Sequence, residues 1–163
     1  MKQSGFTYLG VLFAVAIMAS GLALMGEMWA TSLQREKEAE LLHIGNAYRR
    51  AIMLYYEGSP GGARRYPREL ANLVKDERFP GTRRYLRRVY VDPMTGTTEW
   101  GLMKGPDGGI MGVFSLSKGE PLKRTNFALT DAGLPAGGTY ADWKFAYVAA
   151  PIVAPPPKPA PAR

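Results

Sequence analysis

The chain has 163 residues, with 21 Lys or Arg against 14 Asp or Glu, so its formal net charge is +7. Hydrophobic residues make up 46% of it, a globular balance that predicts one folded domain with additional segments. The absence of cysteine excludes disulfides, thiolate nucleophiles and cysteine-ligated zinc. The single histidine, His43, leaves too few residues for a zinc site or a Ser-His-Asp catalytic relay. Because no pair of carboxylates is placed for acid-base catalysis either, we expect no catalytic residues, metal or cofactor.

The first element is an uncharged apolar run from Phe6 to Gly26. Its 21 residues would rise about 30 Å as a helix, roughly the thickness of a bilayer core, so we expect a membrane-spanning helix. Lys2 precedes the run and no basic residue follows it before Arg35, which predicts a cytoplasmic N-terminus and an external remainder. A secretory signal peptide would have a shorter apolar region, about 7–15 residues, followed by an A-x-A-like cleavage site. The run here is longer and no convincing cleavage site follows Gly26, so a signal peptide is not the preferred interpretation.

The predicted helix continues to Glu57, because residues 31–57 contain no proline and only one glycine. An amphipathic stripe of apolar residues at spacings of three and four is expected to face the core: Leu41, Ile44, Tyr48, Ile52 and Tyr55. Residues 58–62, GSPGG, predict the end of the helix. The charged residues near its membrane exit are expected to form a solvated face: Glu36, Lys37, Glu38 and Glu40. His43, one position from the stripe, is expected to be partly packed or solvated.

Several short elements are expected downstream. Leu70, Leu73 and Val74 indicate a short helix, residues 89–91 an extended run, and residues 92–96, DPMTG, a turn into a strand over about 97–103. Residues 105–109, GPDGG, predict a hairpin turn and lack the Lys-Ser/Thr ending of a phosphate-binding loop. A returning strand over 110–117 and a last strand from about 140 complete a small antiparallel sheet. The sequence therefore predicts an α+β fold.

The chain ends in PIVAPPPKPAPAR, with six prolines in thirteen residues. This composition predicts an exposed segment of polyproline II character over residues 151–163. A dispensable extension is preferred here over a partner-binding segment.

A basic stretch runs from Arg64 to Arg88, with nine basic residues against three acidic ones and interleaved aromatic residues. Such a patch suits phosphate contacts and base stacking. The candidate residues for an anion or DNA patch are Arg64, Arg65, Arg83, Arg84, Arg87 and Arg88. Basic surface that is solvated, or that pairs with an acidic neighbouring subunit, is more common, so nucleic acid is not the preferred partner.

The stretch Gly5-Phe6-Thr7-Tyr8-Leu9, with a short lysine-containing leader before it and an apolar helix after it, resembles the processing signal of type IV pilins and type II secretion pseudopilins. The order Tyr66-Pro67, Leu70, Leu73, Tyr85-Leu86 and Asp92-Pro93 with Gly96 resembles the soluble domain of the major pseudopilin. The resemblance covers roughly residues 1–150. It implies a pilin-like fold in which the long helix, membrane-spanning in its first half, packs against the small sheet.

The resemblance also implies how the chain is processed and used. Residues 1–5 would be a leader, prepilin peptidase would cut between Gly5 and Phe6, and the same enzyme would methylate Phe6. Residues 6–30 would be the transmembrane and assembly helix and residues 31–150 the periplasmic domain. Side chains near the new N-terminus would serve helix assembly: Phe6, Leu9, Gly10, Leu12 and Phe13. The partners would be other pseudopilin subunits, the peptidase and an inner-membrane assembly platform.

Three features depart from the family pattern: the fifth residue of the mature chain, the late loop, and the proline-rich ending described above. Most members carry glutamate as the fifth residue of the mature chain, where its carboxylate offsets the N-terminal amine, whereas this chain has Gly10. An unpaired ammonium in apolar surroundings is costly, so its charge would have to stay hydrated or meet an acid of another subunit, for example at a filament tip, unless assembly tolerates the loss. The late loop, which is acidic and binds calcium in the major pseudopilin, is basic here over residues 115–124, so we expect no calcium site.

Three functions remain open from the sequence. The preferred one is a pseudopilin-like subunit of a type II secretion system, in the bacterial inner membrane and then in a short periplasmic filament for protein export. The alternative is a minor type IV pilin that takes part in DNA uptake or adhesion through the basic patch. The third is a monomeric periplasmic module whose apolar start is only a tether.

Overall fold

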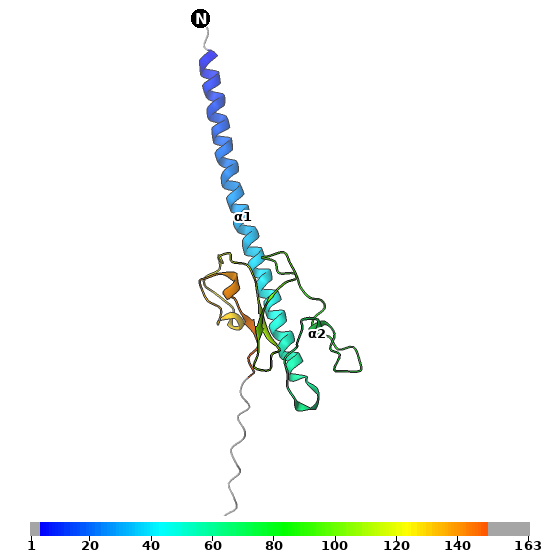
Figure 1. The fold of residues 1–163 in the computed structure, drawn as a ribbon. Helices are drawn as coiled ribbons and strands as arrows, with labels where there is room; N and C mark the ends of the chain where they lie inside the picture. Colours follow the sequence, from blue (N-terminus) through cyan, green and yellow to red (C-terminus); the bar gives the residue numbers. More distant parts are fainter. Residues whose placement is uncertain (1–3, 150–163) are drawn as a thin grey trace, which may run out of the picture. The chain divides into compact units, whose positions relative to one another are not determined.

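The computed structural model describes residues 4–149, without the side chains of residues 4–7, 21–27 and 62 (Figure 1). The described chain divides into two compact units: residues 4–46, 90–101 and 114–144 form the first, and residues 47–89, 102–113 and 145–149 form the second. The helices and strands are, in chain order, α1 (Ser4–Glu57), η1 (Pro60–Gly62), α2 (Ala71–Val74), β1 (Gly101–Lys104), β2 (Ile110–Phe114), η2 (Leu129–Asp131), η3 (Tyr140–Asp142) and β3 (Phe145–Ala146).

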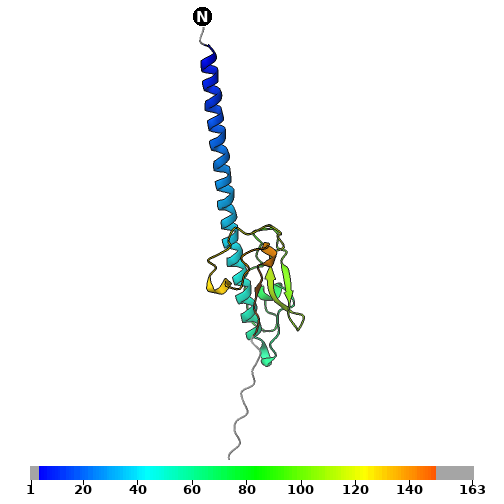
Figure 2. The same ribbon diagram turned by 90° about the vertical axis from the view of Figure 1, so that its left-hand side faces the viewer.

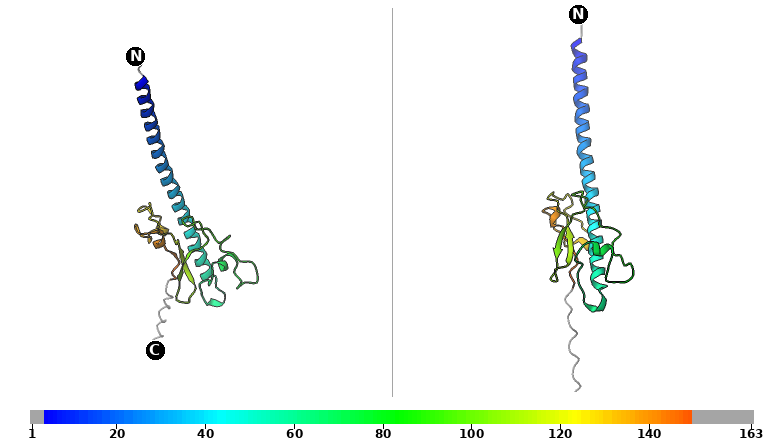
Figure 3. Two further views of the ribbon diagram at one scale, coloured as in Figure 1. Left: turned by 45° about the horizontal axis from the view of Figure 1, so that its top comes forward. Right: turned by 45° about the vertical axis from the view of Figure 1, so that its right-hand side comes forward.

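Helix α1 is one uninterrupted element, as both views of Figure 3 show. It ends where the sequence predicts: the Gly58 N–H donates the last helical bond to the Leu54 carbonyl at 2.9 Å, and Pro60 follows. A side chain at position 58 would come 2.9 Å from that carbonyl oxygen, so glycine fits this end of the helix. The predicted stripe is confirmed, since all five of its members are buried: Leu41, Ile44, Tyr48, Ile52 and Tyr55.

In the first unit, a buried turn organises residues 90–101. The carboxylate of Asp92 accepts hydrogen bonds from the Met94 N–H at 2.8 Å and the Ser115 hydroxyl at 2.6 Å. The Gly96 N–H donates to the Asp92 carbonyl at 2.8 Å, and Gly96 has a φ of 74°, a left-handed conformation that glycine adopts without strain. The predicted turn over residues 92–96 is therefore confirmed.

In the second unit, β1, β2 and β3 form a three-stranded sheet in that order, and Figure 2 shows β1 and β2 side by side. Strands β2 and β3 are antiparallel, with Gly112 opposite Ala146 and Val113 opposite Phe145. The buried residues of this unit include Leu73 of α2, the α1 residues Ala51 and Ile52, and Ile110 and Val113 of β2. A long helix with a small antiparallel sheet confirms the α+β prediction.

The strand boundaries differ from the prediction. The first strand begins at Gly101 instead of about residue 97, because the Thr97 carbonyl accepts from the Asp92 N–H at 2.8 Å and Trp100 Nε1 donates to the Tyr90 carbonyl at 2.8 Å. These bonds hold residues 97–100 in a loop. The returning strand ends at Phe114, and residues 89–91 belong to no strand.

The predicted last strand is also shorter than expected. Residues 140–142 form η3, whose start is fixed by the Asp142 carboxylate accepting from the Thr139 N–H at 2.8 Å and the Thr139 hydroxyl at 3.0 Å. Only Phe145 and Ala146 remain extended and paired. The short helix around Leu70–Val74 is confirmed as α2. The predicted polyproline tail, residues 151–163, lies outside the described residues.

A close approach between Gly109 and Tyr66 yields a stability prediction. A Cβ at position 109 would lie 2.6–2.9 Å from the Tyr66 backbone and Cβ, so Gly109→Ala should destabilise the full chain by about 1–3 kcal/mol in urea unfolding. Gly81→Ala is the control, because its Cβ meets nothing within 4 Å, and it should change stability by less than about 0.5 kcal/mol. Equal effects of the two substitutions would contradict this account.

Candidate functional site

The start of α1 presents large apolar side chains to its surroundings. In the isolated chain their exposed fractions run from 48% for Leu12 to 71% for Ile17. The full set between residues 8 and 18 is Tyr8, Leu9, Val11, Leu12, Phe13, Val15, Ile17 and Met18. So much exposed apolar surface is typical of a protein or lipid contact.

The predicted assembly residues lie on this part of α1. Leu9, Leu12 and Phe13 are exposed, and a Cβ at Gly10 would meet nothing within 4 Å, so space is open around that position. Gly5 and Phe6 lie within α1, and their side chains fall outside the described ones. The structure therefore brings Leu9, Gly10, Leu12 and Phe13 onto one exposed helical segment.

A membrane span was expected over residues 6–26, and parts of that run lack described side chains. Among the residues that the structure describes, no helix is both long and apolar enough to cross a membrane. The span therefore stays a prediction.

Glu38 corrects the predicted solvated face of the helix. Its side chain is 3% exposed, and its carboxylate accepts hydrogen bonds from three donors: the Leu122 N–H at 2.5 Å, the Lys123 N–H at 3.1 Å and the Tyr140 hydroxyl at 2.8 Å. Two consecutive backbone amides on one carboxylate fix the basic loop on α1. Glu36, Lys37 and Glu40 are exposed as expected.

One turn earlier, Gln34 strengthens the same contact. Its Nε2 donates to the Glu120 carbonyl at 3.2 Å and to the Tyr140 hydroxyl at 2.9 Å. Burial, partly offset by the bond from Gln34 and reinforced by the bond to Glu38, raises the pKa of Tyr140 to about 12. Tyr140 therefore remains protonated and keeps donating to Glu38 throughout the physiological range.

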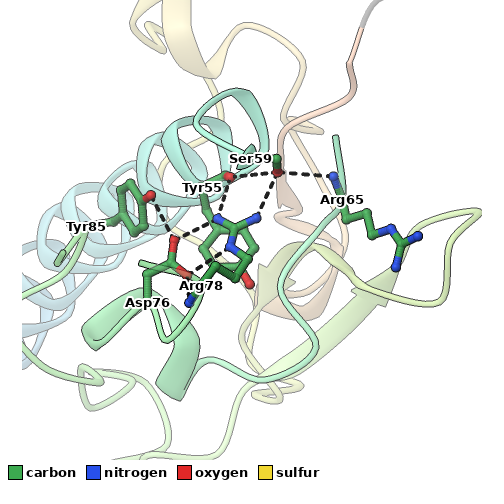
Figure 4. Close-up of polar contacts among 6 residues, drawn as sticks. All are labelled: Tyr55, Ser59, Arg65, Asp76, Arg78 and Tyr85. Carbon is green, nitrogen blue, oxygen red and sulfur yellow. Dashed lines mark hydrogen bonds and ion pairs between the residues drawn. The ribbon is translucent and has the colours of Figure 1, made fainter. Parts of the chain in front are cut away.

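The second unit has a separate polar cluster at the end of α1 (Figure 4). Arg78 pairs with the buried Asp76 through Nε at 2.8 Å and Nη2 at 2.7 Å. Its guanidinium also donates to the Tyr55 carbonyl at 3.0 Å and the Ser59 hydroxyl at 2.8 Å, and it stacks 3.5 Å from the Tyr55 ring centroid. The Tyr85 hydroxyl donates to Asp76 at 3.0 Å. Arg78 thus joins the loop at residues 76–78 to the end of α1 at residues 55–59 and is occupied by structural contacts.

Electrostatics in this cluster favour the charged pair. Burial opposes ionisation of Asp76, but hydrogen bonds from the Arg78 side chain and backbone and from the Tyr85 hydroxyl outweigh it and hold the pKa of Asp76 below its usual value. The bond to Asp76 raises the pKa of Arg78, against an opposing effect of burial. Both groups are therefore ionised at neutral pH.

The six arginines of the predicted anion patch are exposed: Arg64, Arg65, Arg83, Arg84, Arg87 and Arg88. Arg65 contributes only its backbone N–H to the cluster, at 3.3 Å from the Ser59 hydroxyl, and its guanidinium points away (Figure 4). The Arg83 guanidinium lies 4.6 Å from the Phe79 ring centroid. His43 is exposed. The patch therefore lies at the surface, and its ligand stays an open question.

The two carboxylate sites were missed in the sequence. Counting back from Leu41 by helical steps of three and four reaches Glu38 and Gln34, so extending the stripe toward the N-terminus would have placed both on the packed face. Asp76-Glu77-Arg78 is a short-range acid-base spacing, but charged residues of that spacing are common on loops. This pair becomes a structural contact because the Arg78 guanidinium also reaches the Tyr55 carbonyl and the Ser59 hydroxyl, which the sequence does not indicate.

Within residues 4–149, excluding the side chains not described, no group of three or more His, Asp or Glu is arranged to hold a metal ion. No family model matches the chain, and no curated protein or solved structure matches it either. The pilin-like family therefore stays a prediction that rests on the N-terminal residues and the turn pattern.

Removing the charge of Glu38 should loosen the loop it holds. In Glu38→Gln an amide N–H₂ would meet backbone N–H donors, so we expect a loss of about 2 kcal/mol in urea unfolding. Glu40→Gln, an exposed change on the same helix, should stay within about 0.5 kcal/mol. A loss no greater than the control would show that the loop does not depend on Glu38.

Asp76 should make stability depend on pH. Its folded pKa is lowered, so its contribution is present above its unfolded pKa of about 3.9 and is lost as pH falls through the folded pKa. Asp76→Asn should cost about 2–3 kcal/mol at pH 7, and the difference from the wild type should shrink below about pH 4. Urea unfolding from pH 7 to pH 2.5 measures this, with Glu77→Gln as the exposed control. A constant difference across that range would refute the assignment.

Proposed function

We propose that this chain is a pilin-like structural subunit, similar to the major pseudopilin of type II secretion, that polymerises through the start of α1. The observation that carries the proposal is the exposed row of large apolar side chains over residues 8–18, on a helix that continues into the packed stripe at Leu41–Tyr55. The C-terminal part of the helix packs its stripe in the folded domain, whereas the described apolar side chains over residues 8–18 are exposed in the isolated chain. A second copy of the same helix is the occupant proposed for that segment.

The energetics of burial favour covering this segment with either lipid or neighbouring helices. Each large apolar side chain that moves from water into an apolar environment contributes about 1.5–3 kcal/mol, and Leu9, Leu12 and Phe13 are each about half exposed or more. Lipid would cover these side chains in the precursor, and neighbouring helices would cover them in a filament. The exchange between these two environments is nearly neutral for apolar surface, which allows assembly from the membrane.

The proposed precursor is a single-pass inner-membrane protein with a cytoplasmic N-terminus and a periplasmic domain. The uncharged run from Phe6 to Gly26 and the placement of Lys2 before it support this orientation. Prepilin peptidase would cut after Gly5 and methylate Phe6, and an inner-membrane platform would receive the mature subunit.

Gly10 bears on where such a subunit sits. It offers no carboxylate for the new ammonium of Phe6, and the space around it is open. The proposal therefore places the ammonium against an acid of another subunit or in water, as at a filament tip. Methylation of Phe6 would leave its positive charge in place.

The polar clusters support a structural role over catalysis. The Glu38 carboxylate accepts from three donors, and the Arg78 guanidinium reaches Asp76, Ser59 and Tyr55. Both groups are therefore committed to holding loops on α1. The alternative of a minor type IV pilin shares the same processing and assembly and differs in using the exposed arginines.

Processing at Gly5 is the direct test. The mature wild-type chain should begin at methylated Phe6 when prepilin peptidase is present and at the intact leader when it is absent, as N-terminal mass spectrometry reads out. Gly5→Leu should lower the mature fraction at least about tenfold, because a bulky residue blocks the cut, while Gly10→Ala should be cut normally. Wild-type chain that keeps Met1, or is cut well beyond Phe6, would refute the proposal.

A further inference from the structure

A second surface feature lies in the second unit and is independent of the proposed assembly. It is an open groove of about 560 Å³ whose lining includes Tyr56 of α1, Tyr66, Pro106 of the hairpin turn, and Val148 and Ala149. Helix, hairpin and the end of the described chain therefore meet around one hollow. None of the contacts already described uses it.

The lining of this groove includes a pair of tyrosine rings in contact. The Tyr56 and Tyr66 ring centroids lie 4.5 Å apart, with their planes at 34°, and the Tyr147 ring lies 6.0 Å from Tyr56. Tyr56 lines the groove and is only partly buried, so part of its ring surface is open to the groove, whereas Tyr66 is 9% exposed and Tyr147 lies beside Tyr56 outside the lining. Closely set tyrosine rings with hydroxyl groups are the surface that binds segments of polyproline II conformation, since proline rings pack on aromatic faces.

The end of the described chain forms part of the groove wall and is bonded to one of its tyrosines. The Tyr66 hydroxyl donates to the Tyr147 carbonyl at 3.2 Å and accepts from the Ala149 N–H at 3.3 Å. The Tyr147 hydroxyl in turn donates to Glu57 at 2.9 Å. Residues 147–149 are thus fixed along the aromatic rings, and the chain continues from Ala149 into its proline-rich segment.

The sequence that follows matches the groove in composition. Residues 151–157, PIVAPPP, have four prolines and no charge, and they would extend about 22 Å at 3.1 Å per residue in polyproline II. Because this segment starts two residues beyond Ala149, its effective concentration at the groove is in the millimolar range or above. A preformed polyproline II segment also loses little entropy on binding.

Charge selects which part of the tail fits. Arg64 and Lys104 also line the groove, and Asp107 accepts from the N–H groups of Tyr66 at 2.9 Å and Gly109 at 3.0 Å. The charged groups of the lining are two cations and one carboxylate, a net charge of +1 that disfavours Lys158 and Arg163 slightly and accepts the uncharged residues before them. We infer that the groove of Tyr56 and Tyr66 is a polyproline-binding site that holds residues 151–157 of the same chain.

The absence of cysteine from the chain allows a direct crosslinking test. The full-length double variant Arg64→Cys/Ala154→Cys places one thiol in the lining and one in the tail. Arg84→Cys/Ala154→Cys is the matched control, because Arg84 is exposed in the same unit and does not line the groove. Under mild oxidation the first pair should form a disulfide within one chain at least about tenfold faster than the control, as non-reducing gels and mass spectrometry measure.

Two further variants separate docking from chance contact. Tyr56→Ala, or replacement of Pro155, Pro156 and Pro157 by serine, should reduce the rate of the first pair to that of the control, while Tyr56→Phe should keep it. Circular dichroism checks that each variant is folded. Equal rates for the two pairs would overturn the inference, and crosslinks found only between two chains would overturn it in favour of a second copy's tail.

Discussion

The structure depends on one constraint, which is that a single helix contributes buried side chains to the cores of both compact units. Leu41 and Ile44 are buried in the first unit, and Tyr48, Ile52 and Tyr55 in the second. With a sheet of only three short strands, neither unit has an internal layer large enough to replace this stripe. A break in α1 between these residues would therefore remove core contacts from both units, which explains why residues 31–57 contain no proline.

Polar side chains on and beside α1 hold the loops against the helix through hydrogen bonds. Loops are long in both units, and their backbone groups must find partners. Glu38 supplies acceptors for two consecutive amides of the late loop, and Arg78 connects residues 55, 59 and 76 in the second unit. Each of these groups sits beside the stripe of α1, so the helix organises loops as well as apolar packing.

The parts of the fold that follow from local rules could be predicted. Helical spacing gave the buried face of α1, Gly58 and Pro60 gave its end, and the glycine-containing turns at 92–96 and 105–109 were found from their composition. Strand lengths could not be obtained in this way, because the Asp92 N–H binds the Thr97 carbonyl and its carboxylate binds Ser115, 23 residues away. The inward direction of Glu38 depended on donors more than 80 residues away.

The candidate site divides along the same line. The apolar segment at residues 8–18 could be predicted from the sequence, because a continuous run of apolar residues is recognised from its composition alone. The tyrosine groove is not, since Tyr56, Tyr66 and Tyr147 come from three separate segments. The loop at Leu122 and Lys123 is coupled to the helical state of α1, because its two amides bind the carboxylate of Glu38. Unwinding the turn of α1 at residue 38 would leave those amides without acceptors, so pulling on the helix would also release the loop.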